Sequence, residues 1–305
     1  MYSLFKERVY NLISHFVKKA YAVGYRFNDD NSEFKYCEEI PFSILMPIKK
    51  EWYADPFPFI WRGEHYIFVE IMKEENNKRG TLGYTCLERD NGEFHEILSE
   101  PFHLSYPNVF EFKEKIYMIP ETNQANQLRI YEAVSFPNKW ELKKVLLEEI
   151  CCVDTSIYFD TQDVFLETYD QIREKNRLFR LNEKFNLYEI ETENSVFVDR
   201  RPGGNFIQYD TGLYHALQNC DGSYGKWLHI AKVDSFSLDG LYEREIGTYK
   251  LKNVKHDAKG VFNRIHTFNR TENFEVIDLH LYQLKFEIEK KEIEKGFRCY
   301  KRGSK

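Results

Sequence analysis

Alternating apolar and polar positions recur along the chain as pairs of short runs joined by polar turns. The pairs span residues 55–70, 106–121, 154–167, 201–218 and 263–278. Each pair consists of an apolar run, a turn of two to five residues and a second apolar run that ends in an acid or an amide. This pattern predicts five β-hairpins.

The hairpins begin at a nearly constant interval. The first four starts are separated by 51, 48 and 47 residues, and a longer gap precedes the fifth. Periods of this size are typical of repeat architectures, and four strands per repeat fit a propeller blade. We therefore expect an all-β fold, a five-bladed β-propeller over residues 22–300. Its last blade is expected to use strands from residues 275–300 and an early strand near residues 40–46.

The two ends of the chain differ from the repeats. Apolar residues within 1–21 fall at helical spacing, which predicts a short amphipathic N-terminal helix. This helix either packs on the rim of the propeller or makes peripheral membrane contact through residues 1–20, where lysines and an arginine flank the apolar positions. No apolar run of 18 residues and no signal-peptide core occur. Residues 301–305 are expected to form a disordered tail.

Composition supports the β assignment and narrows the function classes. The 25 Phe, 21 Tyr and 4 Trp suit pleated, half-buried surfaces. The net charge of -6 comes from mixed charges rather than blocks, which argues against a nucleic acid polymer as partner. The six cysteines form no CxxC pair, so we expect reduced thiols in a cytoplasmic protein, at the inner membrane face if the helix binds there. Neither a cofactor-binding glycine motif nor metal-ligand histidine spacing is present, so no cofactor is expected, and a metal in the axial channel stays an alternative that no sequence motif supports.

Unusual residues begin the first strand of each hairpin, where Thr, Val or Ser would be ordinary. They are Asp55, Tyr106, Asp154, Arg201 and, in the last hairpin, Arg264 or His266. Because the innermost strands of a propeller converge on its axis, we expect several of these residues to line one pocket. In the plainer interpretation Arg201 only balances the two aspartates across the channel.

Asp55 is the strongest catalytic candidate. Pro56 restricts it to extended backbone geometry, and the neighbouring Trp52 offers the flat apolar surface that a sugar-binding subsite needs. The alternative is an ordinary turn-forming Asp-Pro pair.

Three glutamates close the second strands of the first three hairpins. Glu70, Glu121 and Glu167 stand 15, 15 and 13 residues from their strand starts, which predicts equivalent places in their blades. Alternation along a strand leaves open whether they face the pocket or solvent. A ring of inward carboxyl groups would raise at least one pKa, which is how a carboxyl group becomes a general acid.

The fourth and fifth hairpins carry further polar candidates. Arg201 stands beside Gly203 and Gly204 and could hold a phosphate or a carboxylate through two parallel hydrogen bonds. His266 could serve as a ligand or an acid–base group, although a lone histidine is more often simply hydrogen-bonded.

Several ordered motifs resemble a known bacterial and plant domain. The strings at residues 52–57, 105–111, 117–122 and 153–156 are similar to the domain at the N-terminus of glucosamine inositolphosphorylceramide transferase. Arg201 to Gly204, Gln218, Tyr224-Gly225 and His266-Thr267 continue the match, which covers about residues 22–280. That domain is similar to the five-bladed glycoside hydrolases of the arabinanase, levansucrase and invertase type.

The resemblance implies roles for particular residues. An aspartate in the first blade, here Asp55, would be the base or nucleophile, and a second aspartate would tune and orient. The second blade opens with Tyr106 instead of an acid, so Asp154 is proposed for that second role. The general acid would be one of four glutamates: Glu121, Glu111, Glu167 or Glu70.

Three hypotheses follow. The first is a carbohydrate-active enzyme that transfers or hydrolyses a glycan or a nucleotide- or lipid-linked sugar in cell-surface polysaccharide or glycolipid metabolism. Its predicted catalytic residues are Asp55, Asp154 and Glu121, and its predicted substrate-binding residues are Trp52, Tyr106, Glu70, Glu111, Arg201, Gln218, Tyr224 and His266. The second is a non-catalytic glycan-binding propeller. The third, a protein scaffold, would place its unusual residues on the rim instead of the axis. We expect the enzyme.

Overall fold

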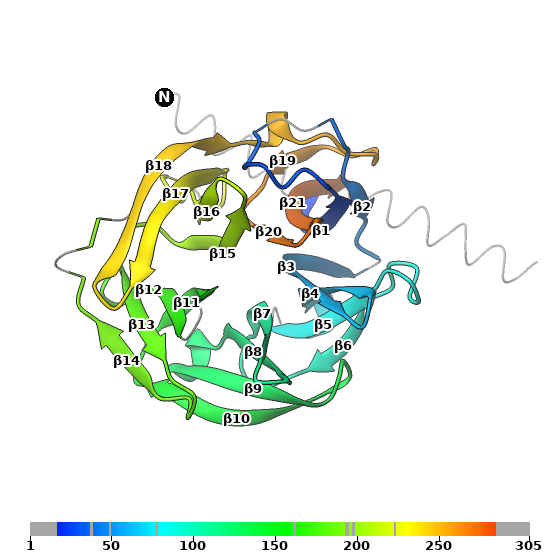
Figure 1. Cartoon of the computed structure of the whole chain (residues 1–305). Coiled ribbons are helices and arrows are strands. Elements are labelled where there is room, and N and C mark those ends of the chain that lie inside the picture. The colour runs from blue at the N-terminus through cyan, green and yellow to red at the C-terminus, as the bar shows by residue number, and fades with distance from the viewer. Residues whose placement is uncertain are drawn as a thin grey trace, which may run out of the picture.

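Five antiparallel sheets stand around a central axis (Figure 1). A computed structural model describes residues 17–36, 39–48, 50–76, 79–160, 163–192, 195–196, 199–222 and 224–284. Four of the sheets have four strands each, and the fifth has five. The predicted all-β, five-bladed β-propeller is confirmed.

The first four blades follow the chain from the axis outward. Blade 1 contains β3 (Glu51–Trp61), β4 (Glu64–Lys73), β5 (Gly80–Cys86) and β6 (His95–Leu98). Blade 2 contains β7 (Ser105–Phe112), β8 (Lys115–Glu121), β9 (Gln127–Ser135) and β10 (Lys139–Glu148). Blade 3 contains β11 (Cys152–Phe159), β12 (Val164–Asp170), β13 (Lys175–Leu181) and β14 (Leu187–Ile190). Blade 4 contains β15 (Pro202–Tyr209), β16 (Gly212–Gln218), β17 (Leu228–Ser237) and β18 (Gly240–Tyr249). Single 3-10 turns lie at Glu74–Asn76, Asn123–Ala125 and Leu251–Asn253.

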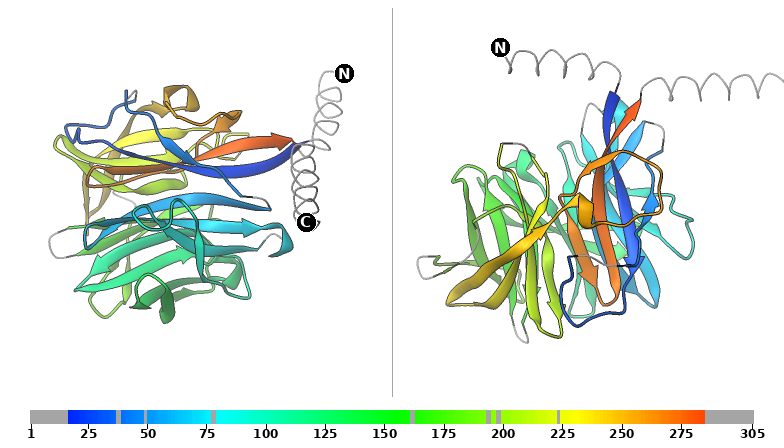
Figure 2. Two further views of the ribbon diagram at one scale, coloured as in Figure 1. Left: turned by 90° about the vertical axis from the view of Figure 1, so that its right-hand side faces the viewer. Right: turned by 90° about the horizontal axis from the view of Figure 1, so that it is seen from above.

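Blade 5 is assembled from both ends of the described chain. Its strands are β19 (Phe262–Arg264), β20 (Phe268–Thr271), β21 (Phe274–Leu284), β1 (Val17–Phe27) and β2 (Ser43–Leu45). The long strands β1 and β21 pair along their whole length, from Val17 opposite Leu284 to Phe27 opposite Phe274. They lie side by side in both views of Figure 2. An N-terminal strand therefore closes the ring.

The predicted N-terminal helix is wrong for residues 17–21, which belong to β1. Pairing with β21 supplies their backbone hydrogen bonds, and the alternation of β1 buries Ala20 and Ala22 in the core. The rest of the predicted helix, the end of the predicted propeller beyond residue 284 and the predicted tail lie outside the described residues. The early strand expected near residues 40–46 is present as β2. Within the described part of the chain, no helix is long and apolar enough to cross a bilayer.

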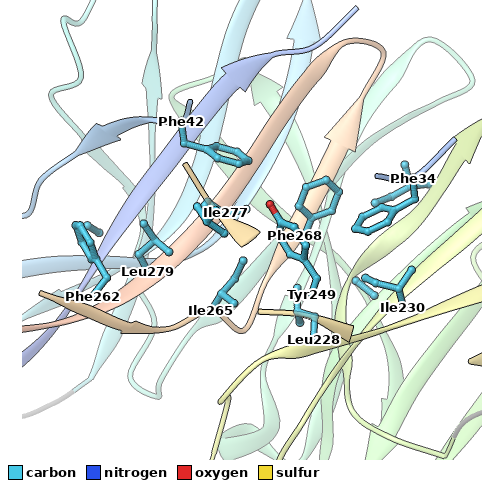
Figure 3. Close-up of a cluster of buried hydrophobic side chains, with 14 of the residues drawn as sticks. Phe34, Phe42, Leu228, Ile230, Tyr249, Phe262, Ile265, Phe268, Ile277 and Leu279 are labelled. Carbon is cyan, nitrogen blue, oxygen red and sulfur yellow. The ribbon is translucent and has the colours of Figure 1, made fainter. Parts of the chain in front are cut away.

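Apolar side chains fill the space between neighbouring blades. Figure 3 shows the cluster between blades 4 and 5, where Phe34 and Phe42 from the segment after β1 pack near Tyr249, Phe268 and Ile277. All five side chains are almost fully buried. This cluster fastens the closing strand and its following segment to the ring by removing apolar surface from water.

A β-bulge interrupts the innermost strand of each of the first four blades. The pairing register slips near the beginning of β3, β7, β11 and β15. Asp55, Tyr106 and Asp154 occupy these bulges with φ of 50°, 50° and 51°, and Gly204 has φ 147°. Left-handed backbone is uncommon outside glycine, and bulges re-aim side chains. The extended geometry expected for Asp55 ahead of Pro56 is therefore wrong.

Three asparagines near the axis form a hydrogen-bond network that reaches all five blades. The amides of Asn108 and Asn205 exchange hydrogen bonds of 2.6 and 2.8 Å, and the Asn205 backbone N–H donates to Asn269 Oδ1 at 2.7 Å. Asn269 donates to the carbonyl of Pro56 in blade 1, and Asn108 donates to the carbonyl of Thr155 in blade 3, both at 2.8 Å. We call these three residues the axial asparagine network.

Replacing Asn108 by Ala is expected to lower the free energy of unfolding by about 1–3 kcal/mol, because it leaves buried partners without hydrogen bonds. Urea denaturation measures this change. The matched control is Asn31→Ala, which removes an exposed amide that bonds only to Asp210 in the described structure. Equal losses in the two variants would contradict a structural role for the network.

Candidate functional site

A cavity of about 150 Å³ lies at the end of the axis where the innermost strands begin. Its walls come from all five blades. They are formed by Tyr21, Trp52, Ala54, Asp55, Glu70, His103, Ser105, Glu121, Asp154, Arg201, Tyr224 and His266. We call it the acidic cavity, because four of these side chains are carboxylic acids. Eight of the eleven predicted site residues line it.

The other three predicted residues lie elsewhere. Tyr106 is fully buried between blades, with its ring centroid 4.8 Å from that of Phe57. Gln218 lies behind the wall, where its Nε2 donates to Asp154 Oδ2 at 3.1 Å. Glu111 is exposed and borders a different cavity at the other end of the axis.

The predicted equivalence of Glu167 with Glu70 and Glu121 is wrong. The latter two pair with residues just before the bulges of their blades, whereas Glu167 pairs with Ser156, just after a bulge. It is buried away from the acidic cavity, with its carboxylate 3.4 Å from His215. The shorter offset of 13 residues was the sequence signal of this difference.

Asp55 begins a chain of three charged groups. The Nε2 of His266 lies 3.2 Å from Asp55 Oδ1, and its Nδ1 lies 2.7 Å from Asp278 Oδ2. Burial by itself would lower the pKa of His266, but the Asp278 and Asp55 carboxylates outweigh it and raise that pKa well above its usual value. The backbone N–H groups of His266 and Thr267 donate to Asp278. His266 is therefore an imidazolium held between two carboxylates, and it faces Asp55 with positive charge.

Arg201 connects the two acids on the opposite wall. Its Nε donates to Asp154 Oδ2 at 2.6 Å, and its Nη2 lies 4.0 Å from Glu121 Oε2. Burial and the Asp154 carboxylate raise the pKa of Glu121 to about 8, although Arg201 opposes the shift. Burial also raises the pKa of Asp154, although the nearby Arg201 guanidinium acts to lower it. At neutral pH Glu121 can therefore carry a proton into the cavity.

Glu70 is another acid of the cavity with a raised pKa. Burial and the nearby Asp55 carboxylate raise its pKa well above the usual value. His103 Nε2 lies 3.4 Å from its Oε1, while His103 Nδ1 accepts the backbone N–H of Gly80 at 2.8 Å. That hydrogen bond leaves Nε2 to carry the ring proton.

An aromatic wall covers one side of these polar groups. The ring centroid of Tyr21 lies 5.1 Å from that of His266 and 5.3 Å from that of Trp52. On the other side, the Arg201 guanidinium stacks over Tyr224 at 5.1 Å. Flat rings beside carboxyl groups and a guanidinium suit a ligand with both apolar faces and hydroxyl groups.

Besides Ala54 and Ser105, sequence reasoning missed Tyr21 and His103 in the wall of the cavity and Asp278 behind it. Tyr21 lies in a segment predicted as helix, so its position on a strand of blade 5 could not be predicted. His103 precedes a strand and belongs to none of the hairpin motifs. Asp278 ends the fifth hairpin, and its position as the closing acid of a repeat was a usable signal.

The possibility of a metal site concerns one group of residues. Among the described side chains, only those of Asp55, His266 and Asp278 bring three potential ligand atoms within 4.8 Å of one another. A histidine binds a metal ion only when its imidazole ring is neutral. His266 Nδ1 and Asp55 Oδ1 are buried and form no hydrogen bond with the described residues, so these three side chains fit either an Asp–His–Asp ion-pair chain or a bound cation.

The raised pKa of Glu121 makes the stability of the folded protein depend on pH. Between the usual value of 4.5 and about 8, the folded state binds more protons at this group than the unfolded state does. The free energy of unfolding should therefore fall as pH rises through this interval. Glu121→Gln, which imitates the neutral acid, should reduce the slope in urea unfolding at pH 5, 6.5 and 8. The exposed Glu111→Gln is the control, and equal slopes in all three proteins would contradict the assignment.

Several solved structures that share this architecture are glycoside hydrolases. The catalytic domain of the Coprinopsis cinerea GH62 alpha-L-arabinofuranosidase superposes with a TM-score of 0.54 at 12% identity, over 86% of this chain and 98% of that one. CoXyl43, a GH43 beta-xylosidase/alpha-arabinofuranosidase from a compost metagenome, gives 0.51 at 12% identity, over 83% and 94%. At this level of identity the similarity establishes the fold alone. The protein is a five-bladed propeller of the class seen in these hydrolases.

Within that class the sequence is more specific. The chain belongs to the family described as glucosamine inositolphosphorylceramide transferase 1, N-terminal, which it matches over residues 46–276. The transferase of that name from Arabidopsis thaliana is 30% identical over 208 residues, which is 63% of this chain and 27% of the relative. The one from Oryza sativa subsp. japonica is 29% identical over 205 residues, 62% and 27%. The chain thus spans about a quarter of the length of these relatives, and the predicted family resemblance is confirmed.

Proposed function

We propose that this propeller is a carbohydrate-active enzyme that acts at the anomeric carbon of a glycan or an activated sugar. The observation that carries the proposal is the pairing of two unlike acids in one cavity. Glu121 has a pKa of about 8, while Asp55 faces the His266 imidazolium. An acid with a raised pKa beside a second carboxyl group that faces a cation matches the two carboxyl groups that glycosyl chemistry uses.

In the proposed reaction the two acids have complementary tasks. Glu121 gives its proton to the leaving oxygen as the bond from that oxygen to the anomeric carbon breaks. Asp55 either accepts the proton of the attacking hydroxyl group or attacks the anomeric carbon itself. In the second case the acceptor hydroxyl group then attacks the same carbon, the bond to Asp55 breaks, and Glu121 takes the acceptor's proton. Asp154 touches neither bond in this scheme. It fixes Arg201, which in turn lies 4.0 Å from Glu121 and opposes the rise of its pKa.

The lining residues indicate which chemical groups the substrate carries. Tyr21, Trp52 and Tyr224 provide faces on which a sugar ring can stack, and among the described lining residues Arg201 provides the one guanidinium. Arg201 suits the phosphate of a nucleotide- or lipid-linked donor. The relatives are named as transferases of glucosamine inositolphosphorylceramide, which supports transfer to a glycolipid. We therefore favour transfer from an activated sugar over hydrolysis.

The proposal is tested by turnover of nucleotide sugars with an inositol phosphoceramide acceptor, alongside a panel of oligosaccharides. Glu121→Gln should lower kcat by about 10²–10⁴-fold. In the wild type kcat should decline as pH rises through about 8, because the acid loses its proton there. Glu111→Gln should retain full turnover. Full turnover in Glu121→Gln would remove this residue from the mechanism.

A non-catalytic glycan-binding propeller is the second candidate. The volume of about 150 Å³ favours it, because it is below the usual 300–1,000 Å³ of ligand pockets and fits a terminal sugar rather than a chain. Binding of a glycan without any turnover by the wild type, and with unchanged affinity in Glu121→Gln, would select this alternative.

A further inference from the structure

A second and larger cavity lies at the other end of the axis. Each innermost strand runs from the first cavity towards the second: β3 places Asp55 in one and Phe59 in the other, and β11 places Asp154 in one and Phe159 in the other. The second cavity measures about 410 Å³. Asn205 and Asn269 of the axial asparagine network line it. We call this second space the distal cavity.

The walls of the distal cavity combine aromatic and polar side chains. The aromatic members come from four blades and are Phe59, Phe110, Tyr158, Phe159 and Phe206. Glu111, Gln208 and Thr271 add polar groups, and the amides of Asn205 and Asn269 belong to the axial network. Phe159 is 43% exposed, so its ring is available to a ligand. The volume lies within the usual range for small-molecule sites.

The charged side chains of the distal cavity restrict which ligands can bind there. Among the described residues of this wall, the one cationic side chain is that of Arg270, and it is already paired with Glu275. Glu111 adds an exposed carboxylate. A phosphorylated or otherwise anionic ligand would find no free guanidinium here and would meet a negative charge. The lining therefore favours a neutral ligand.

Polarity narrows the chemistry further. An acyl chain in this space would cover the carboxylate of Glu111 and the side-chain oxygen of Gln208 without replacing their hydrogen bonds to water, which costs free energy. A sugar offers an apolar face to an aromatic ring and hydroxyl groups to the acid and the amides. The mixed wall therefore matches a saccharide better than a lipid.

We propose that the distal cavity binds a neutral saccharide of one or two rings. This second carbohydrate site is separate from the acidic cavity and independent of the function proposed for it. The distal lining contains one carboxyl group, Glu111, and no histidine among the described residues, so it has no acid and base pair. The site holds its ligand without reacting with it.

The test is titration calorimetry with glucose, galactose, mannose, N-acetylglucosamine, cellobiose and lactose, each up to 20 mM. Phe159→Ala alters an exposed side chain, so the fold should tolerate it. It is expected to weaken the affinity for at least one saccharide by about five- to tenfold. Gln208→Ala is a second variant at the same wall and should weaken the same ligand. Trp52→Ala, in the acidic cavity, should leave that affinity unchanged.

Three results would overturn the proposal. The first is that Phe159→Ala and Gln208→Ala change the affinity for no saccharide of the panel. The second is loss of all saccharide binding in Trp52→Ala, which would assign that binding to the acidic cavity. The third is binding of 1-octanol, but of no saccharide, that Phe159→Ala weakens, which would make the distal cavity a site for an apolar chain.

Discussion

Replacing Asp55 by Asn is expected to reduce kcat by about 10³-fold or more. The amide can neither accept the proton of the attacking hydroxyl group nor attack the anomeric carbon. Its second effect is electrostatic, because the Asp55 carboxylate helps to raise the pKa of Glu70 and of Glu121. Removing the carboxylate should therefore lower both pKa values and move the alkaline limb of the pH–rate profile to lower pH.

The fold should survive this change. Asp55 occupies a bulge with φ 50°, and asparagine tolerates left-handed backbone as well as aspartate does. Thermal unfolding of Asp55→Asn should remain cooperative. Asp239→Asn, an exposed position far along the chain, is the matched control and should keep wild-type turnover. Unchanged kcat in a folded Asp55→Asn variant would end the catalytic proposal.

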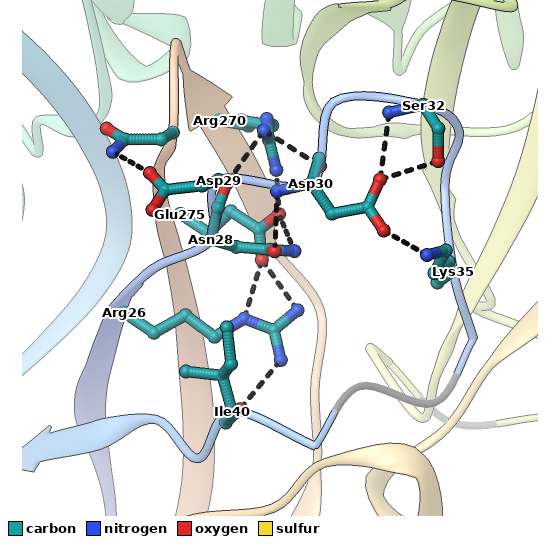
Figure 4. Close-up of polar contacts among 10 residues, drawn as sticks. Arg26, Asn28, Asp29, Asp30, Ser32, Lys35, Ile40, Arg270 and Glu275 are labelled. Atoms are coloured by element: carbon teal, nitrogen blue, oxygen red, sulfur yellow. Dashed lines mark hydrogen bonds and ion pairs between the residues drawn. The ribbon is translucent and has the colours of Figure 1, made fainter.

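Replacing Glu275 by Ala is expected to cost about 3–5 kcal/mol of the free energy of unfolding. Figure 4 shows Glu275 between Arg26 and Arg270, and Arg26 Nε donates to its carboxylate at 2.6 Å. The three side chains are 1%, 4% and 2% exposed. Removing the carboxylate leaves two buried guanidinium groups without a counter-charge, which is far costlier than losing a surface pair.

Urea unfolding measures the loss, and hydrogen exchange locates it. The network joins β1 to β21, so amides of β1 should exchange faster in Glu275→Ala than in the wild type while those of blade 3 change little. Glu141→Ala is the control, because its pair with Lys139 is exposed and worth at most about 1 kcal/mol. A loss in Glu275→Ala no larger than in this control would contradict the closure of the ring through β1.

Much of the fold follows from local pattern. The hairpins of the first four blades are marked by two-residue alternation and by turns, and their interval of about 50 residues sets the blade count. β1 could not be found in this way. Its partner β21 lies about 250 residues further along the chain, and without that partner the apolar residues near Ala20 also fit a helix. Long-range pairing decides the structure of such segments.

The acidic cavity could be predicted in outline because the hairpin pattern locates the strand starts. Strand starts converge on the axis whatever their detailed geometry, so Asp55, Asp154 and Arg201 lie together there. The direction of each side chain depends on the bulges, which leave little trace in the sequence. This is why Tyr106, at an equivalent bulge, turns into the core between blades instead of towards the cavity.

The most direct test of the account is a crystal structure of Asp55→Asn with the sugar substrate that the wild type turns over fastest. The account predicts that the anomeric carbon lies between residue 55 and the Glu121 carboxyl group, with the ring against Trp52 or Tyr21. A substrate bound outside the acidic cavity, or an empty cavity at saturating concentration, would contradict it.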